Sequence, residues 1–172
     1  DGRNFKRVSP FYGFANHFAK VLFQAKNGDI WFSGGRSKIY DGESPISVYR
    51  YDGERFFRLG KENGLDAAQI YDMAETSDGT LWFATLTGIL QFNGKTFLKH
   101  QLANASNTVT YVKDIVVDAD DVLWCATGLG VVRFDSKGFL QFSAADGLQK
   151  GDSVKATPQV FSIEPDLNGG VW

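Results

Sequence analysis

The chain has 172 residues, of which 43% are hydrophobic and 15% aromatic. Such a composition can bury a core, which excludes an intrinsically disordered chain. Eighteen basic residues against 20 acidic ones leave a formal net charge of −2, so the basic surface that nucleic acid or an anionic membrane would need is missing. No run approaches the roughly 18 apolar residues of a membrane-spanning helix, and we expect no direct membrane insertion of this segment.

Short strand-like segments separated by turn residues follow one another along the chain. Residues 1–8 begin with Asp-Gly and have a phenylalanine three residues after the glycine, as do the segments that start at Asp52 and, with Asn-Gly, at Asn93. We therefore expect residues 1–8 to be the outer strand of a preceding unit. Residues 9–58 form the first complete unit, which has a longer connection, around residues 37–47, rich in loop formers.

The second unit, residues 59–100, shows most clearly how a unit is built. An alternating segment at 69–75 and a second one at 80–85 are joined by a turn that contains glycine. A tight reversal leads to a third strand, and the strong hairpin signal Asn93-Gly94 leads to a fourth. These signals predict four antiparallel strands joined by short turns.

Residues 101–143 repeat this arrangement, and residues 144–172 begin a further unit. One tryptophan stands at the same place in each copy, roughly 40–50 residues after the previous one, a period typical of propellers and solenoids. Four-stranded antiparallel units at this period predict an all-β chain folded as β-propeller blades. The four tryptophans are Trp31, Trp82, Trp124 and Trp172. We expect them to fill the spaces between blades, because every blade interface needs the same large side chain.

Candidate catalytic groups are few. Cys125 occupies the position of Phe32 and Phe83 in the other copies, which predicts a small buried side chain and no reactive thiol. The blade register separates the two histidines, His17 and His100. No cluster has metal-ligand spacing, and no nucleophile–base pair or phosphate-binding loop is present. We expect no catalytic residue, no metal and no cofactor.

The repeats resemble the two-component regulator propeller repeat, whose pattern is close to Asp-Gly-x-Leu-Trp-x-Gly-Thr-x-x-Gly-Leu-x-x-Phe-Asp. The segment from Asp78 to Asn93 reproduces it nearly completely, and the segment from Asp121 to Asp135 almost as well. The Asp-Gly-Leu loop between repeats appears as Asn63-Gly-Leu and Asp146-Gly-Leu. The first copy departs most, through its longer connection and through Ser33-Gly in place of Gly-Thr.

The resemblance implies a non-enzymatic sensor module in the periplasm or outside the cell, which belongs to a membrane-bound regulator with a histidine kinase or another output domain. It also implies a ring of seven blades, of which this chain supplies about three complete blades and two partial ones. Oligosaccharides are frequent ligands of such modules. The remaining blades of the same protein are then the expected partners.

A ligand is expected where first strands and loops converge. The register places Lys20, Tyr71, Lys113 and Phe161 in one column of the first strands, and Asp72, Asp114 and Ser162 in the adjacent column. Surface loops add polar side chains suited to sugars. The candidate ligand-binding residues are Arg36, Asn63, Asp66, Tyr71, Asp72, Asn104, Lys113 and Asp114.

Two other classes of function stay open at this point. A structural or protein-interaction propeller would bind another polypeptide, including a second copy that closes the ring as a homodimer. That closure would lack a third strand at the joint, which favours a fragment of a longer chain. A streptogramin lyase-like enzyme would need a clustered histidine and a metal-binding carboxylate, which this stretch does not show.

Overall fold

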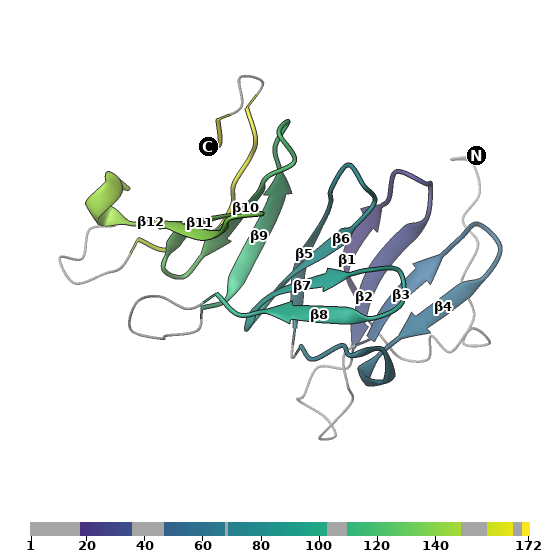
Figure 1. Ribbon diagram of the computed structural model, residues 1–172. Coiled ribbons are helices and arrows are strands. Elements are labelled where there is room, and N and C mark those ends of the chain that lie inside the picture. Colours follow the sequence, from purple (N-terminus) through teal and green to yellow (C-terminus); the bar gives the residue numbers. More distant parts are fainter. Residues whose placement is uncertain (1–17, 36–46, 68, 103–109, 149–157, 167–169) are drawn as a thin grey trace.

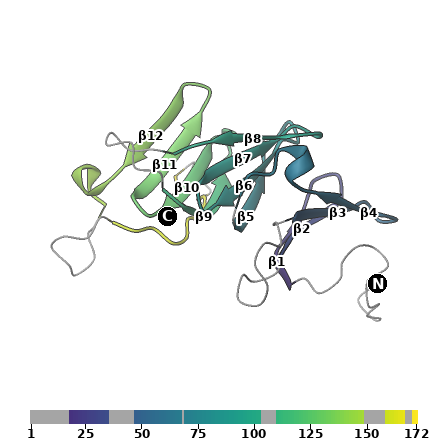
Figure 2. The ribbon, with the colours of Figure 1, turned by 90° about the horizontal axis from the view of Figure 1, so that it is seen from below.

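The computed structural model describes residues 18–35, 47–67, 69–102, 110–148, 158–166 and 170–172. Within them, the chain forms three four-stranded antiparallel sheets, each with its strands in sequence order (Figure 1). The first strands of the three sheets, β1, β5 and β9, lie side by side, and the sheets spread outward from them as successive blades (Figure 2). No helix of the described residues is long and apolar enough to cross a membrane. The prediction of an all-β propeller segment is confirmed.

Each blade contributes four short strands. The first blade has β1 (Phe18–Gln24), β2 (Ile30–Gly35), β3 (Ser47–Tyr51) and β4 (Phe56–Leu59). The second has β5 (Ile70–Glu75), β6 (Leu81–Thr85), β7 (Gly88–Phe92) and β8 (Phe97–His100). The third has β9 (Val112–Val117), β10 (Leu123–Thr127), β11 (Gly130–Asp135) and β12 (Gly138–Phe142). Two short 3-10 helices, η2 (Lys61–Asn63) and η3 (Ala144–Asp146), follow the outer strands β4 and β12.

The Thr-x-x-Gly part of the repeat forms the reversal between the second and third strands. Thr85 Oγ1 donates to the carbonyl of Gly88 at 2.8 Å and accepts from the backbone N–H of Thr87 at 3.1 Å. Thr127 repeats both contacts with Gly130 and Leu129. A buried hydroxyl that is satisfied on both sides fixes this turn, because an unpaired buried polar group would be costly.

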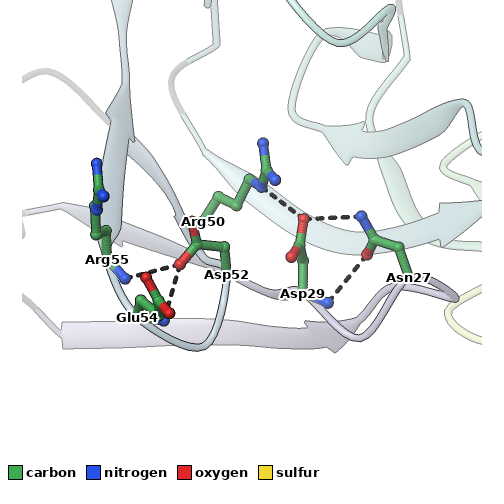
Figure 3. Close-up of polar contacts among 6 residues, drawn as sticks. All are labelled: Asn27, Asp29, Arg50, Asp52, Glu54 and Arg55. Carbon is green, nitrogen blue, oxygen red and sulfur yellow. Dashed lines mark hydrogen bonds and ion pairs between the residues drawn. The ribbon is translucent and has the colours of Figure 1, made fainter.

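The Asp/Asn residue before the outer strand acts as a turn former. Asp52 Oδ1 accepts from the backbone N–H groups of Glu54 and Arg55 (Figure 3), and these bonds hold the pKa of the Asp52 carboxyl below its usual value. Asn93 Oδ1 accepts in the same way from the two backbone N–H groups at the equivalent positions. Such Asx contacts explain why Asp and Asn recur at this place.

The core lies between blades. Trp31 of the first blade meets Phe92 of the second edge-on, with ring centroids 5.5 Å apart. Trp82 of the second blade meets Phe134 of the third in the same way, at 5.4 Å. Both tryptophans are buried, with 4% and 6% of their surface exposed. The predicted role of the tryptophan column is therefore confirmed at these two interfaces.

Trp124 differs from this prediction, because it is only half-buried. It packs against Phe142 of its own blade, with ring centroids 5.8 Å apart, and against the tail segment from residue 158 onward. Trp172 is exposed. The cause is the same for both: no further four-stranded sheet among the described residues covers them.

Leu22 shows the same effect on the first blade. It occupies the position of Met73 and Ile115, which are buried against the preceding blade, yet it is 75% exposed. The described residues hold no sheet on that side of β1. An equivalent sequence position is thus buried only where a neighbouring blade lies next to it.

The tail runs back along the third blade and pairs with itself at its end. The backbone N–H of Val160 donates to the carbonyl of Thr127, which attaches the tail to β10. Glu164 and Trp172 exchange two backbone hydrogen bonds, and Pro165 forms an antiparallel bridge with Val171. The predicted strand at residues 1–8 lies outside the described residues, as does the predicted connection at 37–47 except for Ser47, which begins β3. The division of the chain into units at the stated boundaries stays a prediction.

Candidate functional site

Each innermost strand carries a β-bulge at the same position. The pairing with the second strand shifts between Ala19 and Val21, between Ile70 and Asp72, and between Val112 and Asp114. The extra residues are Lys20, Tyr71 and Lys113. A bulge redirects the side chain of its extra residue and is frequent beside functional sites. Three adjacent strands therefore present an ammonium group, an aromatic ring and a second ammonium group in one row. We call the row of Lys20, Tyr71 and Lys113 the inner ladder.

The inner ladder is a contact cluster across three blades. The Lys113 ammonium lies 3.8 Å from the ring centroid of Tyr71 and 5.5 Å from that of Tyr111. The Lys20 ammonium lies 5.8 Å from the Tyr71 ring. Ammonium groups at these distances are attracted by the ring quadrupole. The register extends the row to Phe161 of the tail, which is 64% exposed.

A second row of side chains ties each blade to the next. Asp72 Oδ2 accepts from the backbone N–H of Ile115 at 3.1 Å. Asp114 Oδ2 accepts from the backbone N–H of Ile163 at 2.9 Å and from the Ser162 hydroxyl at 2.7 Å. Each carboxylate thus holds the first strand of the following unit. In the first blade Val21 occupies this position and offers no acceptor.

The two carboxyl groups of this row also interact. Burial raises the pKa of Asp72 to about 7, and its hydrogen bond to Asp114 adds to this effect. Burial acts in the same sense on Asp114, but hydrogen bonds from Asp72, Ser162 and the backbone of Ile163 outweigh it, so that the pKa of Asp114 is lowered. Near neutral pH the pair therefore retains a proton on Asp72 for part of the time.

The structure brings four of the predicted site residues together: Tyr71, Asp72, Lys113 and Asp114 all lie on β5 and β9. Asn63 and Asp66 contact the outermost strand region of the second blade instead. Asn63 closes η2 by accepting from the N–H of Gly60 and donates to the carbonyl of Lys95, while Asp66 pairs with Lys99 at 3.0 Å. Arg36 and Asn104 lie outside the described residues. Ligand binding by any of the eight remains a prediction.

Sequence reasoning found the ladder residues as a column but missed the bulges. A bulge leaves no gap in an alignment when every copy carries it at the same place. The signal in the sequence is the loss of strict alternation, since the apolar residues Ile70 and Met73 are three positions apart; in the structure both are buried, and Tyr71 and Asp72 between them are half-buried.

The first blade holds a separate polar network at its hairpin turn (Figure 3). Asp29 Oδ2 accepts from Arg50 Nε at 2.6 Å and from Asn27 Nδ2 at 2.9 Å. The side chain of Asp29 is almost fully buried, and the partners that it needs there are both supplied. The network fastens the β1–β2 turn to β3.

The groups suited to catalysis are engaged elsewhere. Cys125 is fully buried, and burial raises the pKa of its thiol, as expected for a core residue. His100 Nε2 lies 3.1 Å from Gln91 Oε1 and the ring packs against Trp82 and Phe134; partial burial lowers its pKa. His17 lies outside the described residues. Within them, no group of three or more His, Cys, Asp or Glu could hold a metal ion.

Comparison with known families supports the resemblance seen in the repeats. The family model described as two component regulator propeller matches residues 64–87, which include the motif around Trp82. The chain therefore carries a two-component regulator propeller repeat, as predicted. Comparison with curated proteins gave no match.

Solved structures share the fold. The extracellular domain of a hybrid two-component system protein from B. thetaiotaomicron superimposes with a TM-score of 0.62 and 16% identity, over 90% of this chain and 20% of that one. PorZ, a surface component of the type-IX secretion system of Porphyromonas gingivalis, gives 0.61 and 17%, over 84% and 21%. A catalytically inactive virginiamycin B lyase from Staphylococcus aureus gives 0.62 and 16%, over 92% and 50%.

At these identities the likeness shows the fold and no more, because one propeller architecture hosts many functions. The chain spans about a fifth of the first two structures and half of the lyase. What the whole protein senses, binds or converts is therefore a matter for proposal.

Proposed function

We propose that this chain is a non-catalytic, ligand-sensing β-propeller segment of a membrane-bound two-component regulator, exposed to the periplasm or the cell exterior. Its ligand is an extracellular carbohydrate or another small molecule. The observation that carries the proposal is the inner ladder: three adjacent blades use the same bulge to present Lys20, Tyr71 and Lys113 together. The repeat match at residues 64–87 and the fold shared with the extracellular domain of a hybrid two-component system protein support the setting.

The absence of catalysis is part of the proposal. Acyl transfer or elimination needs a base placed beside a nucleophile or a polarised substrate. Of the described residues, Cys125 is inaccessible and His100 is packed among aromatic rings with an amide as its polar neighbour. The lyase shares only the fold with this chain, and a shared fold is not evidence of a shared reaction.

The test uses the full-length protein and a panel of neutral and acidic oligosaccharides. Calorimetry is expected to find a saturable ligand whose binding weakens at least tenfold in the Tyr71→Ala variant, while Tyr51→Ala, on the third strand of the first blade, binds normally. Chromatography of the incubated ligand is expected to recover it unchanged. Conversion of the ligand would overturn the non-catalytic assignment, and equal binding by both variants would overturn the assigned site.

A protein-interaction role is the second candidate, and one observation favours it. Leu98 on β8 and Phe139 and Leu140 on β12 are large apolar side chains that lie 58%, 45% and 54% exposed on the outermost strands. A partner polypeptide would cover such positions. Substituting Leu98 and Leu140 by serine would then abolish complex formation while leaving oligosaccharide binding intact.

A further inference from the structure

The two lysines of the inner ladder contact aromatic rings, whereas two other described lysines bond to oxygen atoms. Lys26 donates from Nζ to the carbonyl of Thr76, and Lys99 pairs with Asp66. Among the described residues, no ion pair involves Lys20 or Lys113. Their ammonium groups contact tyrosine rings instead, which attract a cation but do not neutralise it.

The nearest carboxylates in sequence do not supply the missing charge. Asp72 follows Tyr71, and Asp114 follows Lys113, but the Oδ2 oxygen of each accepts from the backbone of the next unit, and that of Asp114 also accepts from Ser162. The proton that Asp72 retains near neutral pH also reduces the negative charge of this pair. Two cations with no ion pair among the described residues thus stand on β1 and β9, one on each side of β5, and both lie near the Tyr71 ring, at 5.8 and 3.8 Å.

The end of the row supplies an apolar surface. Asp114 bonds Ser162 and Ile163, so the tail runs directly alongside β9, and the residue before Ser162 follows Lys113 in the row. That residue, Phe161, exposes 64% of its surface. An exposed aromatic ring that follows Lys113 in the row suits a ligand that has a flat apolar face and a negative group.

We propose that the inner ladder binds an anionic saccharide of the uronic acid type, with the carboxylate at Lys20 and Lys113 and one sugar face against Phe161. This inference rests on the proposed function and narrows its ligand class. A carboxylate between two ammonium groups gives charge-assisted hydrogen bonds, whereas a neutral sugar would leave both cations unpaired. Affinity should fall as salt is added, because the contacts lie near the surface.

The experiment titrates the full-length protein with trigalacturonic acid, with its carboxyl-reduced neutral counterpart and with inorganic sulfate. The acid is expected to bind at least tenfold more tightly than the neutral trisaccharide. Lys113→Gln and Lys20→Gln should each weaken the acid about tenfold, and Lys113→Arg should restore most of the loss. Lys137→Gln, on the exposed β11–β12 turn, is the matched control and should bind like the unchanged protein.

Each alternative outcome has a definite meaning. Equal binding of the acid and the neutral trisaccharide, or no effect of either lysine variant, would overturn the proposal that the ligand is anionic. The proposed function as a carbohydrate sensor would then still stand. Sulfate that competes as strongly as the acid would show a simple anion site and refute the saccharide. No binding of any probe would overturn this inference, whereas binding of other neutral sugars in the wider panel would still support the proposed function. Thermal unfolding of every variant confirms that loss of binding is not loss of fold.

Discussion

The indole Nε1 of Trp82 donates a hydrogen bond to the hydroxyl of Thr76, which lies six residues earlier at the start of the same hairpin, at 3.4 Å. Trp124 donates in the same way to Asp118, at 2.7 Å. In the first blade the residue at this position is Ala25, and the buried Trp31 Nε1 has no acceptor among the described residues. The tryptophan column thus needs a second column of acceptors, which the first blade lacks.

Supplying that acceptor should stabilise the first interface. We expect Ala25→Thr to be about 1 kcal/mol more stable than Ala25→Val, since the two side chains have the same shape and a buried donor gains its partner only in the former. Urea unfolding of both variants measures the difference. Because Ala25 is buried, both substitutions can lose some stability to crowding, so the comparison between them is the test. Equal stability would mean that the indole is satisfied in another way.

Asp121 is the one described non-glycine residue with positive φ, at 64°, where the other blades have Gly28 and Gly79. Its carboxylate accepts from the backbone N–H of Ser77 at 2.6 Å and from the Ser77 hydroxyl at 2.8 Å, across the interface between blades. We expect a double-mutant cycle with Asp121→Asn and Ser77→Ala to give a coupling of about 0.5–1 kcal/mol, the range of an exposed hydrogen bond. Additive effects would show that the bond from the Ser77 hydroxyl contributes nothing to blade docking, since the backbone N–H of residue 77 is kept in both variants.

The repeated parts of the fold could be predicted from the sequence, because each short signal occurs several times. Trp82 and Asn93-Gly94 identify a second strand and a hairpin, and the neighbouring copies fix the register. Burial could not be predicted from position alone. Leu22 and Trp124 fit their columns but are exposed or half-buried, since burial depends on a neighbouring blade that a column does not guarantee.

The candidate site was predictable only in part. Aligning the first strands placed Tyr71 beside Lys113 and Asp72 beside Asp114, and the structure shows both contacts. The loop residue Asn63 was chosen for its polarity, but its side chain closes a 3-10 turn. Polarity does not distinguish a side chain that binds a ligand from one that satisfies its own backbone, and that distinction requires coordinates.

Gly88 and Gly94 together allow backbone strain and steric clash, the two costs of an added side chain, to be measured separately. Its φ is 115°, and an added Cβ would lie 2.4 Å from the carbonyl oxygen of His100. Gly94 has a similar φ, 91°, but open space around it. We expect Gly94→Ala to cost about 1–2 kcal/mol from backbone strain, and Gly88→Ala to cost about 2–4 kcal/mol because overpacking is added. Denaturant unfolding measures both, and a Gly88 variant as stable as the Gly94 variant would refute the clash.

The pKa of Asp72 predicts how stability depends on pH. Burial and the hydrogen bond to Asp114 raise this pKa from 3.8 to about 7, so the folded chain holds a proton that the unfolded chain releases. The contribution of Asp72 to the free energy of unfolding is complete below pH 3.8 and is lost as the pH rises through about 7. The pKa of Asp114 is shifted downward, so its effect falls below pH 3.8 and outside this window.

Asp72→Asn should remove this pH dependence. The amide can still accept from the N–H of Ile115 and can donate to Asp114, but it does not titrate. Relative to the unchanged protein, the variant should gain stability as the pH rises from 3.8 to about 7 and should level off above that. Asp78→Asn is the control, because its pKa is lowered by the backbone N–H of Thr80 and it does not titrate in that window. A constant difference between Asp72→Asn and the unchanged protein would contradict the raised pKa.

The tryptophan column allows a graded test of blade packing. Trp82 lies between two four-stranded sheets and contacts Phe134, whereas Trp124 is half-buried and stacks on Phe142 of its own blade. We expect Trp82→Ala to cost about 3–5 kcal/mol, the range for deleting a large buried aromatic side chain. Trp124→Ala should cost less, since less of its surface leaves water on folding. Both are measured by urea unfolding of the same chain. A loss below 1 kcal/mol for Trp82, or a larger loss for Trp124, would show that neighbouring blades do not depend on this column for their docking.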